Sequence, residues 1–125
     1  MSGKGIIDIP SALPVAQTID RLQSMLRARA IRVFARIDQK KEAAAVGLSM
    51  RETQLLIFGD PRAGTPLMTR YPSIAVDLPV KAVAWESADG KVWLSYNSPE
   101  YLKERHDMDS PPFLALEAIM AEAAR

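Results

Sequence analysis

The sequence predicts a single α+β domain over residues 1–125, in which helices cover one face of a curved, antiparallel-rich sheet. Residues 15–26 carry apolar side chains at helical spacing, whereas residues 31–37 alternate apolar and polar side chains as strands do. Asp89-Gly90 lies between two apolar segments, where it predicts a β-hairpin. No repeat or linker divides the chain, and 125 residues are enough for one conventional core.

Local signals set the expected boundaries of the elements. Asp38 predicts a helix cap, Gly47 a helix end, and Pro99 and Pro111 the first positions of two C-terminal helices. The elements expected are strands at 5–9, 31–37, 55–58, 80–86 and 91–96, and helices at 14–29, 40–46, 65–71, 99–106 and from 111 onward.

The hairpin at Asp89-Gly90 has two possible registers. A two-residue turn separates Trp85 from Trp93, with Trp85 on the apolar side and Trp93 on the less buried side. A three-residue turn puts Trp85 opposite Trp93 and mixes the two faces. The cleaner separation favours the two-residue turn.

The segment from Phe58 to Met68 joins an apolar strand to a helix. Gly59 lets the chain turn, Asp60-Pro61 predicts a tight turn, and Thr65 followed by Pro66 predicts the start of the helix. Such a junction presents backbone N–H groups to an anion, although its spacing matches neither common nucleotide-binding fingerprint. The residues expected to bind a small anionic ligand are Gly59, Asp60, Arg62, Gly64, Thr65 and Lys81. The alternative is a purely structural loop.

The mixed face of the strand at 31–37 predicts an interaction surface. If this strand and the hairpin share a sheet, Arg32, Phe34 and Arg36 join Trp93 on one face. Aromatic side chains flanked by arginine are enriched at protein interfaces. We therefore expect a homodimer interface there.

Two residues are candidates for catalysis. His106 lies at a predicted helix C-terminus, where a solvated cap is the simpler interpretation, and Asp60 lies at the junction with Arg62. An enzyme acting on an anionic metabolite would need Asp60, Arg62, Lys81 and His106 to converge on one cleft. A binding module has no such requirement, and it is the function we favour.

Composition narrows the classes of partner. The chain has no cysteine and a single histidine, which excludes disulfides, thiolate chemistry and a metal site made of histidines alone. A net charge of +1 gives no reason to expect nucleic acid or an anionic membrane. The first residues lack the apolar core of a signal peptide. We expect a cytoplasmic protein without cofactor.

Several motifs together resemble one known family. They are residues 59–68 (GDPRAGTPLM), residues 77–81 (DLPVK), residues 85–86 (WE) and residues 89–97 (DGKVWLSYN), with the weaker matches TIDRL at 18–22 and VFARID at 33–38. This pattern is similar to the bacterial and archaeal domain of unknown function 302. The resemblance implies a single-copy TATA-binding-protein-like sheet in a β-α-β(4)-α arrangement, and it implies no particular reaction. Relatives often have histidine after the aspartate of VFARID, where this chain has Gln39, so a metal or haem role does not transfer.

Overall fold

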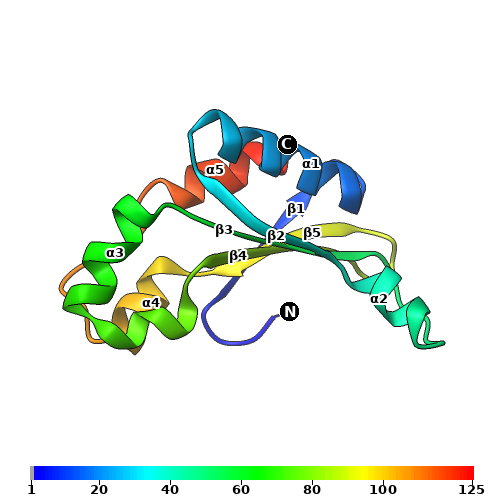
Figure 1. The fold of residues 1–125 in the computed structure, drawn as a ribbon. Helices are drawn as coiled ribbons and strands as arrows, with labels where there is room; N and C mark the ends of the chain where they lie inside the picture. Colours follow the sequence, from blue (N-terminus) through cyan, green and yellow to red (C-terminus); the bar gives the residue numbers. More distant parts are fainter. Residues whose placement is uncertain (1) are drawn as a thin grey trace.

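The computed structural model describes residues 2–125 and contains one five-stranded antiparallel sheet (Figure 1). Its strand order is β1-β5-β4-β3-β2, so the first strand lies beside the last. The strands are β1 (Ile6–Ser11), β2 (Arg32–Asp38), β3 (Thr53–Gly59), β4 (Val80–Glu86) and β5 (Val92–Asn97). The expected α+β class and antiparallel sheet are confirmed.

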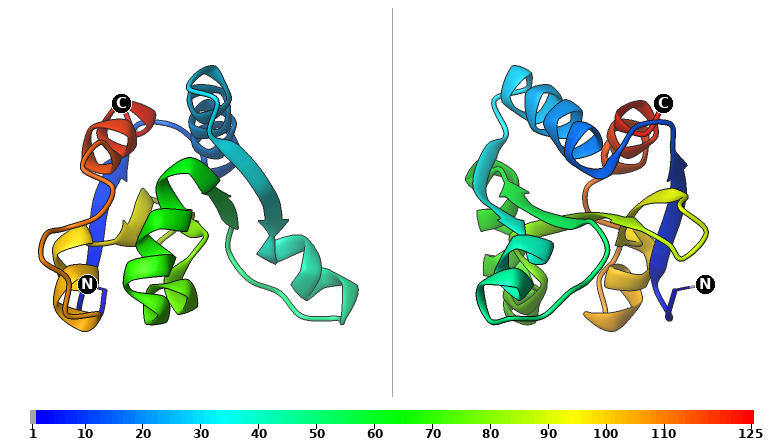
Figure 2. Two further views of the ribbon diagram at one scale, coloured as in Figure 1. Left: turned by 60° about the vertical axis from the view of Figure 1, so that its left-hand side comes forward. Right: turned by 90° about the vertical axis from the view of Figure 1, so that its right-hand side faces the viewer.

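The helices fall into two groups (Figure 2). The first group, α1 (Val15–Ala28) and α5 (Leu116–Ala123), lies side by side on one face of the sheet. The second group lies at the ends of the strands: α2 (Gln39–Ala45), α3 (Pro61–Arg70), the 3₁₀ helix η1 (Pro72–Asp77) and α4 (Pro99–Arg105). Within residues 2–125, no helix is long and apolar enough to cross a membrane.

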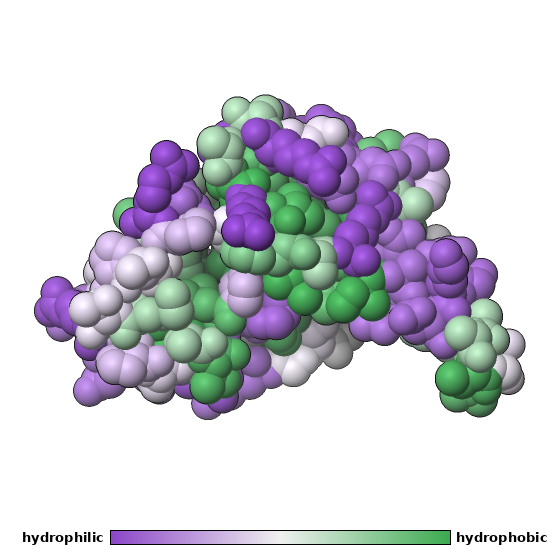
Figure 3. Space-filling model, viewed as in Figure 1, coloured by the Kyte–Doolittle hydropathy of each residue, from purple (hydrophilic) through white to green (hydrophobic). Residues whose placement is uncertain are grey.

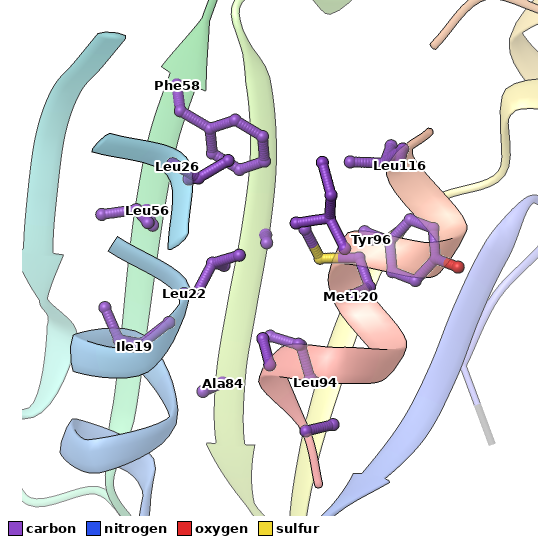
Figure 4. Packing of buried hydrophobic residues seen from close by; sticks show 14 of the residues in the cluster. Ile19, Leu22, Leu26, Leu56, Phe58, Ala84, Leu94, Tyr96, Leu116 and Met120 are labelled. Atoms are coloured by element: carbon purple, nitrogen blue, oxygen red, sulfur yellow. The ribbon is translucent and has the colours of Figure 1, made fainter. Parts of the chain in front are cut away.

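The main core lies between the sheet and the first group of helices (Figure 4). Ile19, Leu22 and Leu26 of α1 have no exposed surface, as their helical spacing predicts. They pack with Leu56 and Leu94 from the sheet. Burying a side chain of this size contributes roughly 1.5–3 kcal/mol, so this face is the main source of stability.

A smaller core holds α3, η1 and α4 together. Ile74 of η1, Leu102 of α4 and Met108 form it, and Leu67 and Met68 of α3 pack against it. These helices therefore form a separate layer beyond the strand ends, anchored by its own apolar contacts.

A bulge in β2 overturns the expected alternation there. The register with β3 shifts between Val33 and Ala35, so Arg36 lies opposite the buried Leu56. Because directly opposed residues share a face, Arg36 points toward α1 and donates to Asp20 at 2.6 Å. The alternation expected for residues 31–37 fails because one extra residue reverses every side chain after it.

The β4–β5 hairpin has the register that we did not favour. Glu86 lies opposite Val92 and Trp85 opposite Trp93, and Ser87 N–H donates to Lys91 at 2.8 Å. The loop therefore has three residues, and its last residue, Gly90, has a φ of +83°. Glycine adopts this conformation readily, which suits a three-residue loop as well as a two-residue turn.

The last helix begins later than expected. Residues 111–115 are irregular, Phe113 has a φ of +58°, and α5 starts at Leu116. Pro112 disfavours a helical conformation of Pro111, so the Pro-Pro pair delays the helix. Phe113 consequently lies before the helix that was expected to include it, and it packs against both cores.

Gly5 and Gly3 offer a matched test of the packing between β1 and α4. Gly5 has a φ of +77°, and a Cβ there would lie 2.3 Å from the Tyr101 ring, whereas a Cβ at Gly3 meets nothing within 4 Å. We expect Gly5→Ala to lower the free energy of unfolding by at least about 2 kcal/mol and Gly3→Ala by less than about 0.5 kcal/mol. Urea unfolding measures both. Equal losses would contradict the close approach of Tyr101.

Candidate functional site

The strand-to-helix junction after β3 differs from the sequence expectation. Helix α3 begins at Pro61, with Asp60 as its N-cap, so Arg62 lies in the first helical turn and not on a loop. Thr65 and Pro66, expected at the helix start, lie inside α3. Asp60-Pro61 combines an N-cap side chain with a proline at the first helical position, and this pair starts the helix before Thr65 can.

Gly64 is an ordinary helical residue. It has no positive φ, and an added Cβ would meet Leu78 Cδ1 at 3.7 Å and Met68 Cε at 3.9 Å. The backbone at this position therefore does not require glycine.

The junction borders a cavity of about 180 Å³, which we call the α3 cavity. Four of the six expected ligand-binding residues line it: Gly59, Asp60, Gly64 and Thr65. The remaining lining residues are Phe34, Pro61, Met68, Leu78, Pro79, Val80 and Phe113. The cavity is thus mainly apolar, with one ionisable side chain, Asp60.

Asp60 is already engaged by its own helix. Its Oδ1 accepts hydrogen bonds from Arg62 N–H at 3.0 Å and Arg62 Nε at 3.1 Å. The side-chain hydrogen bond from Arg62, followed by the backbone bond, lowers the pKa of Asp60 below its usual value of 3.8. The Arg62 side chain is 75% exposed and does not line the cavity, so its charge serves Asp60 and solvent.

Lys81, the sixth expected ligand residue, lies outside the α3 cavity. It is opposite Ile57 on the face of the sheet away from α1, and its Nζ donates to the Pro79 carbonyl at 3.2 Å. Among residues 2–125 it forms no ion pair with Asp60. Val80 lines the α3 cavity, and adjacent residues of a strand point to opposite faces of the sheet. Lys81 therefore points away from the cavity that it was expected to serve.

His106 lies at the end of α4, away from the lining of the α3 cavity. Its side chain is only 4% exposed, Nδ1 is 2.7 Å from Ser73 Oγ, and Nε2 is 2.5 Å from Asp77 Oδ2. It therefore joins α4 to η1 and is not a solvated cap. None of these three residues lines the α3 cavity, and in the described chain no hydrogen bond joins His106 to Asp60, Arg62 or Lys81. Of the four proposed catalytic residues, only Asp60 lines the α3 cavity.

The expected interaction surface is also divided. Arg32 lies 4.9 Å from the centre of the Phe34 ring on the edge strand β2, but β3 and β4 separate this pair from Trp93 on β5. Arg36 lies on the helix-covered face because of the bulge. Trp93 instead stacks against Trp85, a residue that the favoured hairpin register had placed on the opposite face.

Several cavity residues were not predicted as site residues. Phe113 was expected only as part of the helix from residue 111 onward. Leu78, Pro79 and Val80 had a partial signal because they fall within the DLPVK motif, as Met68 did within GDPRAGTPLM. Their convergence depends on how the layer of α3, η1 and α4 packs against the sheet.

These features define a small α+β domain with an apolar cavity at a strand-to-helix junction. Residues 7–123 match the family described as "Domain of unknown function DUF302", and the chain belongs to that family. A crystal structure of an uncharacterised conserved DUF302 protein from Bacillus stearothermophilus has the same fold. Its TM-score is 0.74 at 17% identity, covering 96% of this chain and 90% of that one.

Two curated relatives from Brucella are each described as "Fluoride-specific ion channel FluC 1". The Brucella suis biovar 1 (strain 1330) protein is 38% identical over 116 residues, which is 93% of this chain and 46% of that protein. The Brucella abortus biovar 1 (strain 9-941) protein is also 38% identical over 116 residues, 43% of its length. The chain thus spans less than half the length of these relatives.

The cap and ion pair of Asp60 predict a pH-dependent contribution to stability. The folded pKa is below the unfolded value, so the contribution is present above about pH 3.8 and is lost as the pH falls through the folded pKa. Asp60→Asn keeps a capping side chain but removes the charge, whereas Asp60→Ala removes both. At pH 7 we expect melting temperatures to fall in the order wild type, Asp60→Asn, Asp60→Ala.

Thermal unfolding monitored by circular dichroism between pH 7 and pH 2 measures this effect. The gap between wild type and Asp60→Asn should narrow below pH 3.8. A gap that stays constant with pH would show that the charge of Asp60 contributes nothing.

Proposed function

We propose that this chain is a non-catalytic binding module whose principal site is the α3 cavity. The observation that carries the proposal is a cavity of about 180 Å³, lined by apolar side chains and the single carboxyl of Asp60. A cavity of about 150 Å³ lined by apolar side chains is known to admit benzene. A ligand with a compact hydrocarbon body therefore fits by size and polarity.

The lining also favours a particular polar group on the ligand. Both hydrogen bonds to Asp60 Oδ1 come from Arg62, whereas Oδ2 accepts a single, longer one at 3.3 Å. A carboxylate oxygen has room for a second donor. We expect the ligand to bring a hydroxyl or amine to Oδ2. An anionic ligand, as anticipated from the loop, would first have to draw Arg62 away from Asp60.

Binding is better supported than catalysis. A covalent nucleophile is commonly activated by an adjacent base, and acid-base catalysis commonly uses a group whose pKa lies near the operating pH. The α3 cavity is lined by one carboxyl, held ionised by Arg62, and by no histidine or lysine. The alternative of an enzyme using Asp60, Arg62, Lys81 and His106 is less well supported, because only Asp60 of these four lines the α3 cavity.

The Brucella relatives suggest a setting for such a module. This chain corresponds to less than half of each protein described as a fluoride channel, and residues 2–125 contain no helix able to cross a membrane. We propose that domains of this kind bind a ligand next to a transport function carried elsewhere. A cytoplasmic location is part of the proposal.

Homodimerisation through β2 and the segment beyond α2 also belongs to the proposal. β2 is an edge strand, and its Phe34 is 43% exposed. Beyond α2 the chain carries Val46 and Leu48, which are 73% and 66% exposed, and Figure 3 shows apolar atoms gathered at this projecting tip. An unpaired edge next to exposed apolar side chains favours association with a second copy.

A matched ligand series tests the α3 cavity. Benzyl alcohol, benzylamine and benzoate share one ring and differ in the group that would face Asp60. We expect the alcohol and the amine to bind with a Kd of roughly 0.1–1 mM, as suits ligands of this size. Benzoate should bind at least about tenfold more weakly because it approaches a carboxylate. Methyl NMR of Met68 reports occupancy, and fluoride added alone should leave this signal unchanged.

Gly64→Leu and Thr69→Leu provide the controls for this series. Gly64 lines the cavity, whereas Thr69 is an exposed residue of the same helix. Gly64→Leu should abolish binding and Thr69→Leu should not. Preferential binding of benzoate would instead support the anionic ligand, and binding unaffected by Gly64→Leu would place the ligand elsewhere.

The dimer is tested by light scattering coupled to size-exclusion chromatography. We expect wild type to be a dimer and Leu48→Asp to shift it toward monomer, because a charge at the apolar tip must then be desolvated. Leu114→Asp is the control, since Leu114 is 84% exposed near α5, outside this surface. A monomeric wild-type protein would refute the dimer, and equal effects of both variants would refute the assigned surface.

A further inference from the structure

The sheet has a second depression on the face away from α1, near the β4–β5 hairpin. It encloses about 610 Å³ and is lined by Ile6, Asp8, Trp85, Ser87, Ala88, Asp89 and Trp93. We call it the tryptophan pocket. Val80, which lines the α3 cavity, is five positions from Trp85 along β4, a distance of roughly 17 Å. The tryptophan pocket is therefore a separate site.

Two indole rings form the aromatic part of this pocket. Trp85 and Trp93 are directly opposed in register, with ring centroids 6.4 Å apart and an interplanar angle of 26°. Each N–H group is bound within the protein: Trp85 Nε1 donates to Ser95 Oγ at 2.8 Å, and Trp93 Nε1 donates to Ser87 Oγ at 3.3 Å. These bonds fix the rings, so a ligand meets their π surfaces and not free N–H donors.

The same two serines connect the indoles to carboxylates. Ser95 Oγ donates to Asp8, and Ser87 Oγ donates to Asp89 at 2.5 Å. Partial burial alone would raise the pKa of Asp8, but the hydrogen bonds from Ser95 and Ser2 outweigh it and lower the pKa. The hydrogen bond from Ser87, with that from Lys91 N–H, lowers the pKa of Asp89. Both side chains are therefore anionic at neutral pH.

Within residues 2–125, neither Asp8 nor Asp89 forms an ion pair with a lysine or arginine. Lys91 is the charged neighbour of Asp89 and interacts with it through the longer-range electrostatic attraction. No group of three or more histidine or acidic residues in the described chain is arranged to hold a metal ion. Aromatic π surfaces next to carboxylates favour an organic cation instead.

We propose that the tryptophan pocket binds a small organic cation with a quaternary ammonium head group, its methyl groups against Trp85 and Trp93 and its charge near Asp8 and Asp89. A quaternary ammonium needs no hydrogen-bond acceptor, which suits carboxylates already occupied by serine donors. It also has a low desolvation cost compared with a primary amine, and it is attracted to the face of an indole ring. This proposal does not depend on the function proposed for the α3 cavity.

Intrinsic fluorescence tests the proposal directly, because the chain contains two tryptophans and both line the pocket. Choline is the probe, and 3,3-dimethyl-1-butanol is its neutral counterpart of the same shape. We expect a saturable fluorescence change with choline and at least about tenfold weaker binding of the neutral alcohol. Equal binding of the two, or no saturable change with choline, would overturn the proposal.

Single substitutions assign the binding to this site. Asp89→Asn, in the exposed hairpin, and Asp8→Asn, on β1, should each weaken choline binding by roughly threefold to tenfold. Glu104→Gln removes an exposed carboxylate on α4, outside the pocket, and should leave the affinity unchanged. If Asp8→Asn disturbs folding through its bond to Ser95, Asp89→Asn remains decisive. Choline affinity unchanged by Asp89→Asn, or equally reduced by Glu104→Gln, would refute a role for the pocket carboxylates.

Discussion

Burial of one face of the sheet under α1 and α5 is the constraint on which the rest of the structure depends. The fully buried Ile19, Leu22 and Leu26 of α1 face Leu56 and Leu94 of the sheet, and α5 covers the neighbouring strands. Because β1, β4 and β5 alternate, fixing this face also fixes which of their side chains appear on the other. The open face therefore receives Trp85, Trp93, Lys81 and Asp8 as a consequence of core packing.

The strand ends carry the second layer of structure, and this layer creates the α3 cavity. Asp60 follows β3 and caps α3, so a single residue joins a core strand to a helix that lies beyond the sheet. Phe113, from the irregular segment before α5, reaches the same place. The cavity exists because these segments meet at a junction where neither of the two cores closes completely.

The two candidate sites differ in chemistry because they lie on different kinds of surface. The α3 cavity is bounded by two layers and is therefore mainly apolar, with Asp60 neutralised by Arg62. The tryptophan pocket lies on an uncovered sheet face, where carboxylates remain hydrated and keep their charge. A hydrocarbon group suits the first site and an organic cation suits the second.

The sequence by itself determined the features that depend on residues close together along the chain. The spacing of Ile19, Leu22 and Leu26 predicted α1. Asp38 predicted a helix cap and Pro99 a helix start, both of which the structure contains, and Asp89-Gly90 predicted the hairpin. Four of the six expected ligand residues also converge, because they lie within seven positions of one another.

Tertiary structure decided the rest. The bulge that turns Arg36 inward, the pairing of Trp85 with Trp93 and the arrival of Phe113 at the α3 cavity all arise from contacts between distant segments. The free-energy differences between alternative registers depend on those contacts, and local sequence patterns do not encode them.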